Sequence, residues 1–160
     1  MNILASKVAY SIDSSSLLHG WRRIYRPKNF GFIWRKLDFL IEEGRLRASI
    51  EVLTELAKKD DDLYAWCKDR RNKLFVEIDD TCQHEVSRIL GRYPRLVDTK
   101  KGRSGGDPFV IALAAISQPR MTVLTEETPG GMKIPDVCRG ENILCMGLAD
   151  MIEQEDWRFD

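Results

Sequence analysis

Hydrophobic and polar positions along the chain follow spacings that predict short strands separated by helices. In "FIWRKLDFLIEEG" (32–44) apolar residues recur every three or four positions, as in a helix with one buried face. "MTVLT" (121–125) is a compact run rich in β-branched residues, which is typical of a buried strand. The patterns predict strands at 7–12, 45–49, 121–125 and 143–147, and helices at 32–44, 50–59, 63–73, 80–93, 108–117 and 148–157.

Alternation of strands and helices predicts an α/β domain with a parallel sheet and right-handed crossovers. The segment 108–117 supports this fold because a helix that is apolar on every face must be covered on both sides. "LFVEI" (74–78) fits either a strand or an extended link, and "TPGGMKIP" (128–135) fits a loop. Since the sequence contains no repeat and no low-complexity linker, we expect one domain over residues 1–160, with a mostly parallel sheet of four to five strands.

Composition excludes several classes of site. The chain has 25 basic residues (Lys and Arg) and 25 acidic residues (Asp and Glu), so its net charge is zero. A basic patch beside an acidic site would cancel in this total. Two histidines and four cysteines without CxxC spacing argue against a zinc site and against a Ser/His/Asp or Cys/His hydrolase. "KGRSGG" lacks the Gly-Lys-Ser/Thr ending of a P-loop. The N-terminal "MNILASKVAY" is too short and polar for a secretory or transmembrane segment, so we expect a cytoplasmic protein with reduced thiols.

Acidic residues follow two of the predicted strands and precede a helix. Asp13 comes directly after the first strand, Glu126 and Glu127 follow 121–125, and Asp107 heads the apolar helix. In open α/β sheets ligands bind outside the carboxyl ends of the strands, so these acids are expected at one edge. Like charges gathered there require a cation, and oxygen ligands suit Mg²⁺ or Mn²⁺. The chemistry indicated is phosphodiester hydrolysis.

Each of these acids also has a purely structural interpretation. Asp107 precedes a proline and could simply cap its helix, and Asp13 could cap a helix that begins in "SSSLL". Glu126 and Glu127 could be solvated turn residues. Their joint position at one sheet edge is what favours a site.

The sequence resembles a known family at four places in order. "AYSIDSSSLL", "ASIEVLTELAKK", "GGDPFVIALAA" and "TVLTEE" are similar to motifs of the PIN (PilT N-terminus-like) domain. With "KIPDVC" near the end, the chain looks like a prokaryotic PIN-like subfamily of nucleases and toxins. The resemblance implies a Rossmann-like three-layer sandwich, a Mg²⁺- or Mn²⁺-dependent ribonuclease, and a toxin that pairs with an antitoxin.

The resemblance also assigns the site residue by residue. It implies metal binding by Asp13, Glu55, Asp107 and Glu127, with Ser14 and Thr125 in support. The family usually has Asp at the fourth position, so Glu127 departs from the pattern by one methylene, and its neighbour Glu126 leaves the choice between the two open.

Glu55 is assigned by the resemblance more than by the residue pattern. Val52, Leu53 and Leu56 lie on the expected buried face of helix 50–59, which puts Glu55 on the polar side. An exposed ion pair with Lys59, four residues later, is the alternative role, and Glu51 is the substitute candidate.

Two basic stretches are candidates for RNA contact. "WRRIYRPK" (21–28) interleaves aromatic residues with Arg22 and Arg23, as base stacking combined with phosphate contact would require. "TKKGRSGG" (99–106) places further cations directly before Asp107: Lys100, Lys101 and Arg103. A solvated basic face is the alternative for either stretch.

We therefore expect a single-domain, metal-dependent endoribonuclease, the toxin of a toxin–antitoxin pair, whose partners are RNA and an antitoxin. No membrane association is expected, and homodimerisation stays open. The alternative is a degenerate PIN-like module that binds nucleic acid or protein without cleaving it. A phosphatase with Asp13 as nucleophile ranks last, because Ser15 occupies the position where that chemistry usually has a second Asp.

Overall fold

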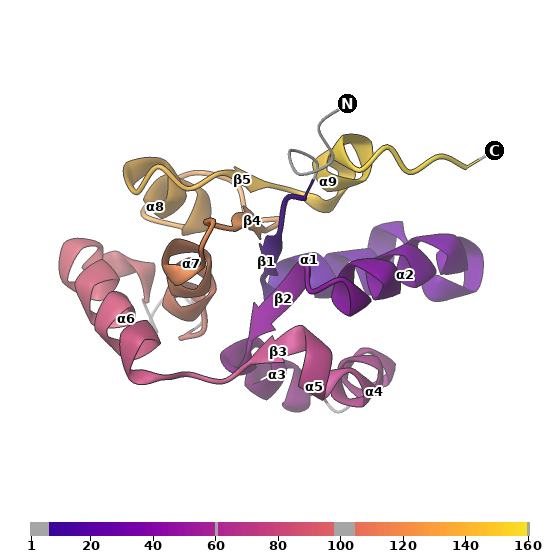
Figure 1. Ribbon diagram of the computed structural model, residues 1–160, viewed down its shortest axis with the longest axis horizontal. Helices are drawn as coiled ribbons and strands as arrows, with labels where there is room; N and C mark the ends of the chain where they lie inside the picture. Colours follow the sequence, from indigo (N-terminus) through magenta and orange to yellow (C-terminus); the bar gives the residue numbers. More distant parts are fainter. Residues whose placement is uncertain (1–6, 60, 98–104, 160) are drawn as a thin grey trace.

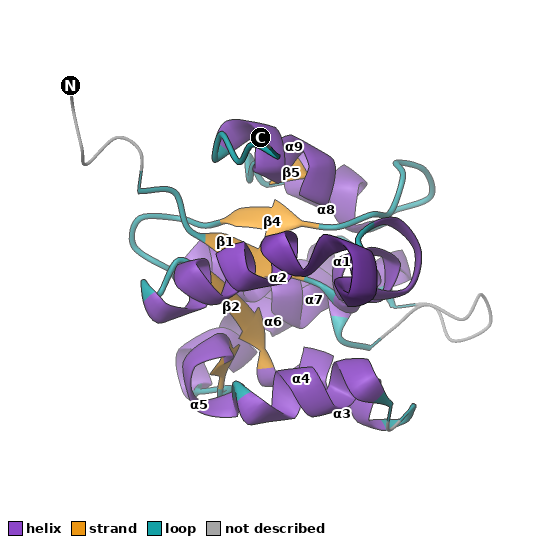
Figure 2. Ribbon diagram, turned by 90° about the vertical axis from the view of Figure 1, so that its right-hand side faces the viewer, coloured by secondary structure: helices purple, strands orange, loops and turns teal. Residues whose placement is uncertain are grey.

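The computed structural model describes residues 7–59, 61–97 and 105–159 of the chain. Its strands pair in parallel in the order β3-β2-β1-β4-β5, with helices on both sides of the sheet (Figures 1 and 2). The strands are β1 (Tyr10–Ile12), β2 (Leu46–Ser49), β3 (Phe75–Val76), β4 (Thr122–Leu124) and β5 (Cys145–Met146). The expected α/β fold is confirmed, and the ambiguous segment 74–78 joins the sheet as the edge strand β3.

Helices connect every pair of consecutive strands. Figure 2 shows α1 and α2 on one face of the sheet and α7 on the other, with α6 packed against α7. Within the described ranges, no helix is long and apolar enough to cross a membrane. The helices are α1 (Ser14–His19), the π-helix η2 (Gly20–Ile24), α2 (Pro27–Glu42), α3 (Ile50–Ala57), α4 (Asp62–Asp69), α5 (Arg71–Leu74), α6 (Asp80–Arg92), the 3₁₀ turn η3 (Pro94–Leu96), α7 (Asp107–Ile116), α8 (Ile134–Gly140) and α9 (Leu148–Gln154).

The core lies on both faces of the sheet. Ile12, Leu46 and Leu124 on the three central strands are completely buried, as is usual for parallel strands covered by helices on both sides. Helix α7 packs between the sheet and α6, so its apolar residues 110–114 are buried, as the sequence predicted, whereas Phe109, Ala115 and Ile116 are partly exposed.

The helix expected at 63–73 is two helices. Arg70 adopts φ −107° and ψ 13°, which ends α4 before α5 begins. Its guanidinium binds the Asp38 carboxylate of α2 and donates to the Trp66 carbonyl (2.9 Å), so a contact between distant segments accompanies the break. Such a contact leaves no trace in the local hydrophobic spacing.

Helix α8 begins inside the segment 128–135, which was expected to be a loop. The Asp136 carboxylate accepts hydrogen bonds from the backbone N–H groups of Gly130 (2.8 Å) and Lys133 (2.9 Å), which stabilises the turn before the helix. Pro135 lies in the first turn, where its missing N–H costs nothing. Proline and glycine therefore mark a helix start here rather than a continuous loop.

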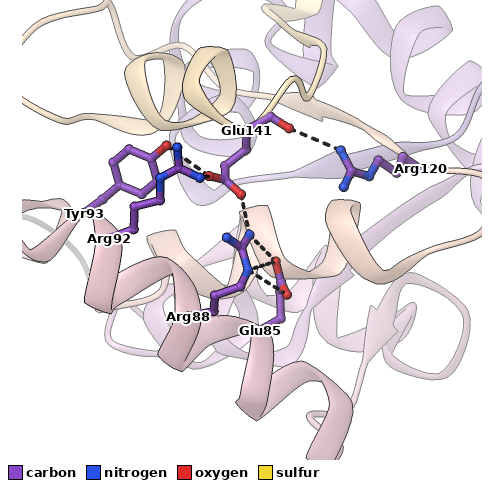
Figure 3. A network of polar contacts seen from close by, with 6 residues as sticks. All are labelled: Glu85, Arg88, Arg92, Tyr93, Arg120 and Glu141. Carbon is purple, nitrogen blue, oxygen red and sulfur yellow. Dashed lines mark hydrogen bonds and ion pairs between the residues drawn. The ribbon is translucent and has the colours of Figure 1, made fainter.

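A polar network around Glu141 joins the end of α8 to α6 (Figure 3). The Glu141 side chain is only 8% exposed and contacts the Arg88 and Arg92 guanidinium groups, the latter at 3.2 Å. The Tyr93 hydroxyl donates to the same carboxylate (3.0 Å), and Arg120 donates to the Glu141 carbonyl (3.2 Å). The network fixes the position of α8 at the side of the sheet.

A second network ties the first strand to the last helix. The buried Tyr10 hydroxyl donates to Glu155 (2.5 Å) and accepts from the Gln154 amide (2.7 Å), while Arg45 donates to the same Glu155 oxygen (2.5 Å). Burial, and then the hydrogen bond to Glu155, raise the pKa of the Tyr10 hydroxyl above its ordinary value. The phenol therefore stays protonated and acts as a permanent donor.

Candidate active site at the carboxyl edge of the sheet

The acids that follow β1 and β4 lie next to each other, because these two strands are neighbours in the sheet and end together. Ile12 is paired with Leu124, and the Asp13 N–H donates to the Leu124 carbonyl (3.0 Å). The chain passes from β1 to β2 on one side, whereas β4 lies on the other side, so the strand order reverses between β1 and β4. Ligands in open α/β sheets bind at such a reversal point, outside the carboxyl ends of the strands.

Asp13 is buried and held by four hydrogen bonds. Its side chain is 2% exposed and accepts from the Ser16 N–H (2.8 Å), which makes it the N-cap of α1. The Thr125 hydroxyl donates to Oδ2 (2.5 Å), and the Ser15 hydroxyl lies 2.8 Å from both carboxylate oxygens. Asp13 therefore caps α1, as its structural interpretation predicted, and also joins the ends of two neighbouring strands through the Thr125 hydroxyl.

The electrostatics of Asp13 favour a bound cation. Burial raises the pKa of its carboxyl to about 6 against the hydrogen bonds from Thr125, Ser16 and Ser15, and the negative charge of Glu127 adds to the rise. A carboxylate in this position is destabilised when ionised, and a nearby positive charge would reverse the effect.

Ser15 is part of the site although the sequence analysis did not assign it there. Its hydroxyl contacts Asp13, lies 3.3 Å from the Thr125 hydroxyl and accepts from the Glu126 N–H (3.0 Å). It thus connects the segments that follow β1 and β4. The available signal was its position in the first turn of a helix capped by Asp13, where a hydroxyl can fold back on the capping carboxylate.

Glu126 and Glu127 point to different surroundings. The Glu127 carboxylate accepts from the Ile134 N–H (3.2 Å) at the start of α8, and its charge reaches Asp13. Glu126 accepts from the Leu148 N–H (3.4 Å) at the start of α9. After burial, the charge of Glu126 is the cause that raises the pKa of the Tyr25 hydroxyl. Of the two glutamates, Glu127 is therefore the one whose charge acts on Asp13.

Glu55 lies near the segment that follows Asp13. The Ser14 hydroxyl, in the first turn of α1, donates to the Glu55 carboxylate on α3 (2.9 Å). The half-buried Glu55 therefore faces α1. Glu51, the substitute candidate, lies in the first turn of the same helix.

Asp107 lies at the same edge of the sheet. The Ser11 hydroxyl of β1 donates to the Val110 carbonyl (2.8 Å), which places α7 beside the strand. Asp107 is 6% exposed and lies one turn before Val110, toward the carboxyl ends of the strands. Gly106 occupies the N-cap position, so Asp107 is the first residue of α7. The interpretation of Asp107 as the N-cap residue was therefore wrong, because Gly106 holds that position.

The chemistry of these donors fits Mg²⁺ or Mn²⁺, since all of them are oxygen atoms of carboxylates. Across residues 7–59, 61–97 and 105–159, no three Asp, Glu, His or Cys side chains lie close enough together to hold a metal ion. The fold therefore brings the acids to one edge, with Asp13 buried beside Glu127, and their side chains would have to converge further on an ion.

Two residues of the basic stretch 21–28 are occupied by contacts within the protein. Arg22 forms an ion pair with Asp61, while Arg23 is exposed. The Trp21 ring packs edge-on against Trp34, with centroids 4.8 Å apart, and belongs to an aromatic cluster rather than standing free for a base. The remaining candidates for RNA contact, Lys100, Lys101 and Arg103, lie outside the described residues.

Comparisons with known proteins agree with this fold. The structure of VapBC2 from Rickettsia felis bound to a DNA fragment from their promoter contains a similar chain, with a TM-score of 0.53 and 13% sequence identity. The match covers 88% of this chain and 98% of that chain, and it shows the PIN-like α/β fold that the sequence motifs predicted. No curated protein matches the sequence. The model of the family described as "Domain of unknown function (DUF4411)" matches residues 10–159, and the chain belongs to this family.

Proposed function

We propose that the protein is a Mg²⁺- or Mn²⁺-dependent endoribonuclease and the toxin of a toxin–antitoxin pair. The observation that carries the proposal is the buried Asp13 carboxylate beside Glu127, at the point where the strand order reverses. Burial of an acid next to another acid is unfavourable for folding, and such an arrangement is typical of a cation site.

In this proposal Asp13, Asp107 and Glu127 hold the ion, and Glu55 adds a fourth carboxylate. A bound divalent ion supplies a Lewis acid for the phosphodiester. Ser15 and Thr125 donate hydrogen bonds that orient Asp13 and favour its ionised form. Ser14 donates a hydrogen bond that orients Glu55. Arg23 is exposed, and we propose that it contacts a phosphate of the RNA.

The antitoxin partner is proposed from the PIN resemblance, and the similarity to VapBC2 supports it at the level of the fold. Large aromatic side chains near the protein surface are consistent with a protein partner, since Phe39 and Phe159 are 63% and 58% exposed.

The test compares RNA cleavage by the purified protein in Mn²⁺ and in EDTA. The matched variant is Asp107→Asn, which keeps a polar side chain in the first turn of α7 and removes the charge that a hard cation prefers. We expect cleavage by the wild type in Mn²⁺ only, and none by the folded variant. Wild-type protein that cuts no RNA, or a variant that cuts at the wild-type rate, would contradict the proposal.

The alternative is a PIN-like module that binds nucleic acid or protein without cleavage. The arrangement of the acids favours this alternative, because within the described residues no three of these side chains lie close enough together to hold a metal ion. Calorimetric titration with Mn²⁺ separates the two functions, because the nuclease requires binding that depends on Asp13 and Asp107, whereas the module does not.

A further inference from the structure

A hollow of about 430 Å³ adjoins the acidic edge between β5, α8 and the segment after β4. Thr125 and Glu127 form the wall that the hollow shares with the candidate active site. Its other walls include Pro135, Arg139, Leu144 and Cys145. Pockets for small ligands have volumes of about 300–1,000 Å³, so the hollow is large enough for one nucleotide but not for a folded partner.

The walls of the hollow combine one cation with apolar surface. Arg139 is exposed on α8, and within the described part of the chain its guanidinium has no ion-pair partner. Leu144 is 72% exposed, and with Pro135 it offers apolar surface. A guanidinium suits a phosphate, and apolar surface suits the face of a base.

The helix that forms one wall is held in place before any ligand arrives. The Glu141 network fixes the end of α8 to α6 (Figure 3), and the Glu127 carboxylate accepts from the Ile134 N–H at its start (3.2 Å). Because α8 is anchored at both ends, Arg139 is presented from a rigid element, which lowers the entropic cost of binding.

We propose that this hollow binds the nucleotide of a single-stranded RNA next to the phosphodiester at the acidic edge. Arg139 contacts a phosphate of that nucleotide, and its base lies against Leu144 and Pro135. The inference rests on the proposed ribonuclease function and names a subsite for its substrate. The observations that carry it are the wall shared with Glu127 and the charge of Arg139, which is complementary to RNA.

Cys145 provides a direct reporter, because it lines the hollow and is half-buried while Cys67, Cys82 and Cys138 are buried. Burial raises the pKa of the Cys67 thiol to about 12, so the buried thiols react slowly. The experiment measures alkylation of Cys145 by N-ethylmaleimide, by mass spectrometry, in Asp13→Asn protein with a ten-nucleotide single-stranded RNA of mixed sequence. At RNA concentrations of about ten times its Kd, we expect alkylation to slow about tenfold.

Two variants separate the roles of the walls. Arg139→Ala should weaken RNA binding about tenfold, as expected for loss of a charged hydrogen bond. It should also reduce the slope of log affinity against log salt concentration by about 0.7, the contribution of one phosphate contact on a single strand. Leu144→Ser should weaken binding without changing the slope. The control is Arg71→Ala, an exposed arginine next to β3 at the opposite edge of the sheet, which should change neither quantity.

The outcomes distinguish this inference from the proposed function. If the wild type cuts RNA in Mn²⁺ but RNA leaves Cys145 alkylation and the Arg139→Ala salt slope unchanged, the subsite is wrong and the ribonuclease stands. If RNA protects Cys145 and the wild type cuts no RNA, the subsite stands and the ribonuclease is wrong. Protection by a partner protein but not by RNA would overturn the subsite.

Discussion

Asp13 has two structural roles because of its position between a strand and a helix. It caps α1 by accepting from the Ser16 N–H, and it receives the Thr125 hydroxyl from the neighbouring strand end. An uncharged side chain could fill both roles. The charge itself is unfavourable in this buried position, where the pKa of the carboxyl is raised to about 6, and the proposed cation site would make the charge useful.

The first prediction follows from this excess charge. Asn caps a helix about as well as Asp, so Asp13→Asn keeps the cap while it removes a buried charge next to Glu127. We expect the metal-free variant to be more stable than the wild type by about 1–3 kcal/mol at pH 8. Mn²⁺ should raise the melting temperature of the wild type and leave that of the variant unchanged.

The control is Asp79→Asn, because Asp79 caps α6 through the Cys82 N–H (2.8 Å) but is exposed. This variant should keep both the wild-type stability and the response to Mn²⁺. An Asp13→Asn protein that Mn²⁺ stabilises as much as the wild type would show that Asp13 does not bind the ion. Differential scanning calorimetry with and without Mn²⁺ measures both effects.

The second prediction separates the two adjacent glutamates. Glu127 is coupled to Asp13 whereas Glu126 faces Tyr25 and α9, so only Glu127 is placed to share a cation with Asp13. Glu127→Gln should lower cleavage and Mn²⁺ affinity by more than about a hundredfold, and Glu126→Gln by about tenfold or less. Equal losses, measured by cleavage rate and by calorimetric titration, would contradict the assignment.

At the scale of elements, α8 depends on contacts outside itself. It spans only Ile134–Gly140, and an isolated helix of this length is not stable in water. The Asp136 carboxylate supports its start and the Glu141 network its end, where Arg88 and Tyr93 of the α6 region hold the carboxylate. The placement of α8, and with it the hollow beside Glu127, is therefore a property of the tertiary structure.

The third prediction concerns this network. Burial by itself would raise the pKa of Glu141, but Arg88, Tyr93 and Arg92 outweigh burial and hold that pKa below its ordinary value of 4.5. The ionised carboxylate therefore contributes stability above pH 4.5, and the contribution is lost as the pH falls through the lowered pKa. Glu141→Gln should cost about 1–2 kcal/mol at pH 7, a modest loss since Arg88 and Arg92 are partly solvated.

The difference between Glu141→Gln and the wild type should narrow below pH 4.5, where the carboxylate of the wild type also becomes neutral. Chemical denaturation at pH 7 and at acidic pH measures this difference. Glu77→Gln is the control, because the Glu77 side chain is 74% exposed and pairs with Arg71 at the surface. A constant difference across the pH range would exclude the ionised carboxylate as the cause.

At the scale of the whole molecule, the fold closes by joining β1 to α9. Tyr10 and Arg45 both donate to Glu155, whose side chain is 11% exposed, so Tyr10 contacts a residue 145 positions later in the chain. This contact holds the last helix against β1, the strand that precedes Asp13. The site and the end of the chain are thus positioned by the same strand.

The fourth prediction tests this closure. Glu155→Ala removes the acceptor of the Tyr10 hydroxyl and the most buried acidic partner of Arg45, so it should cost about 2 kcal/mol of unfolding free energy. Arg158→Ala, which breaks only an exposed pair with Asp156, should change the stability by less than about 0.5 kcal/mol. Urea denaturation of both variants measures the effects, and equal stabilities would show that the network does not contribute.

Local patterns of residues encode part of this structure. Consecutive apolar residues in β4 and the helix α7 without a polar face require burial on both sides, which predicts a parallel sheet between helices. Carboxylates directly after the strand residues Ile12 and Leu124 predict an acidic carboxyl edge, because parallel strands end together. These features depend on residue order alone, and the structure places them as expected.

Other features depend on contacts between distant residues and therefore emerge only when the whole chain packs. The break between α4 and α5 accompanies the Arg70–Asp38 contact, and the role of Ser15 depends on Thr125, 110 positions away. The different directions of Glu126 and Glu127 follow from which helix start, α9 or α8, supplies the N–H that each accepts. Adjacent identical side chains carry no local signal that distinguishes them, so packing of the whole chain makes the distinction.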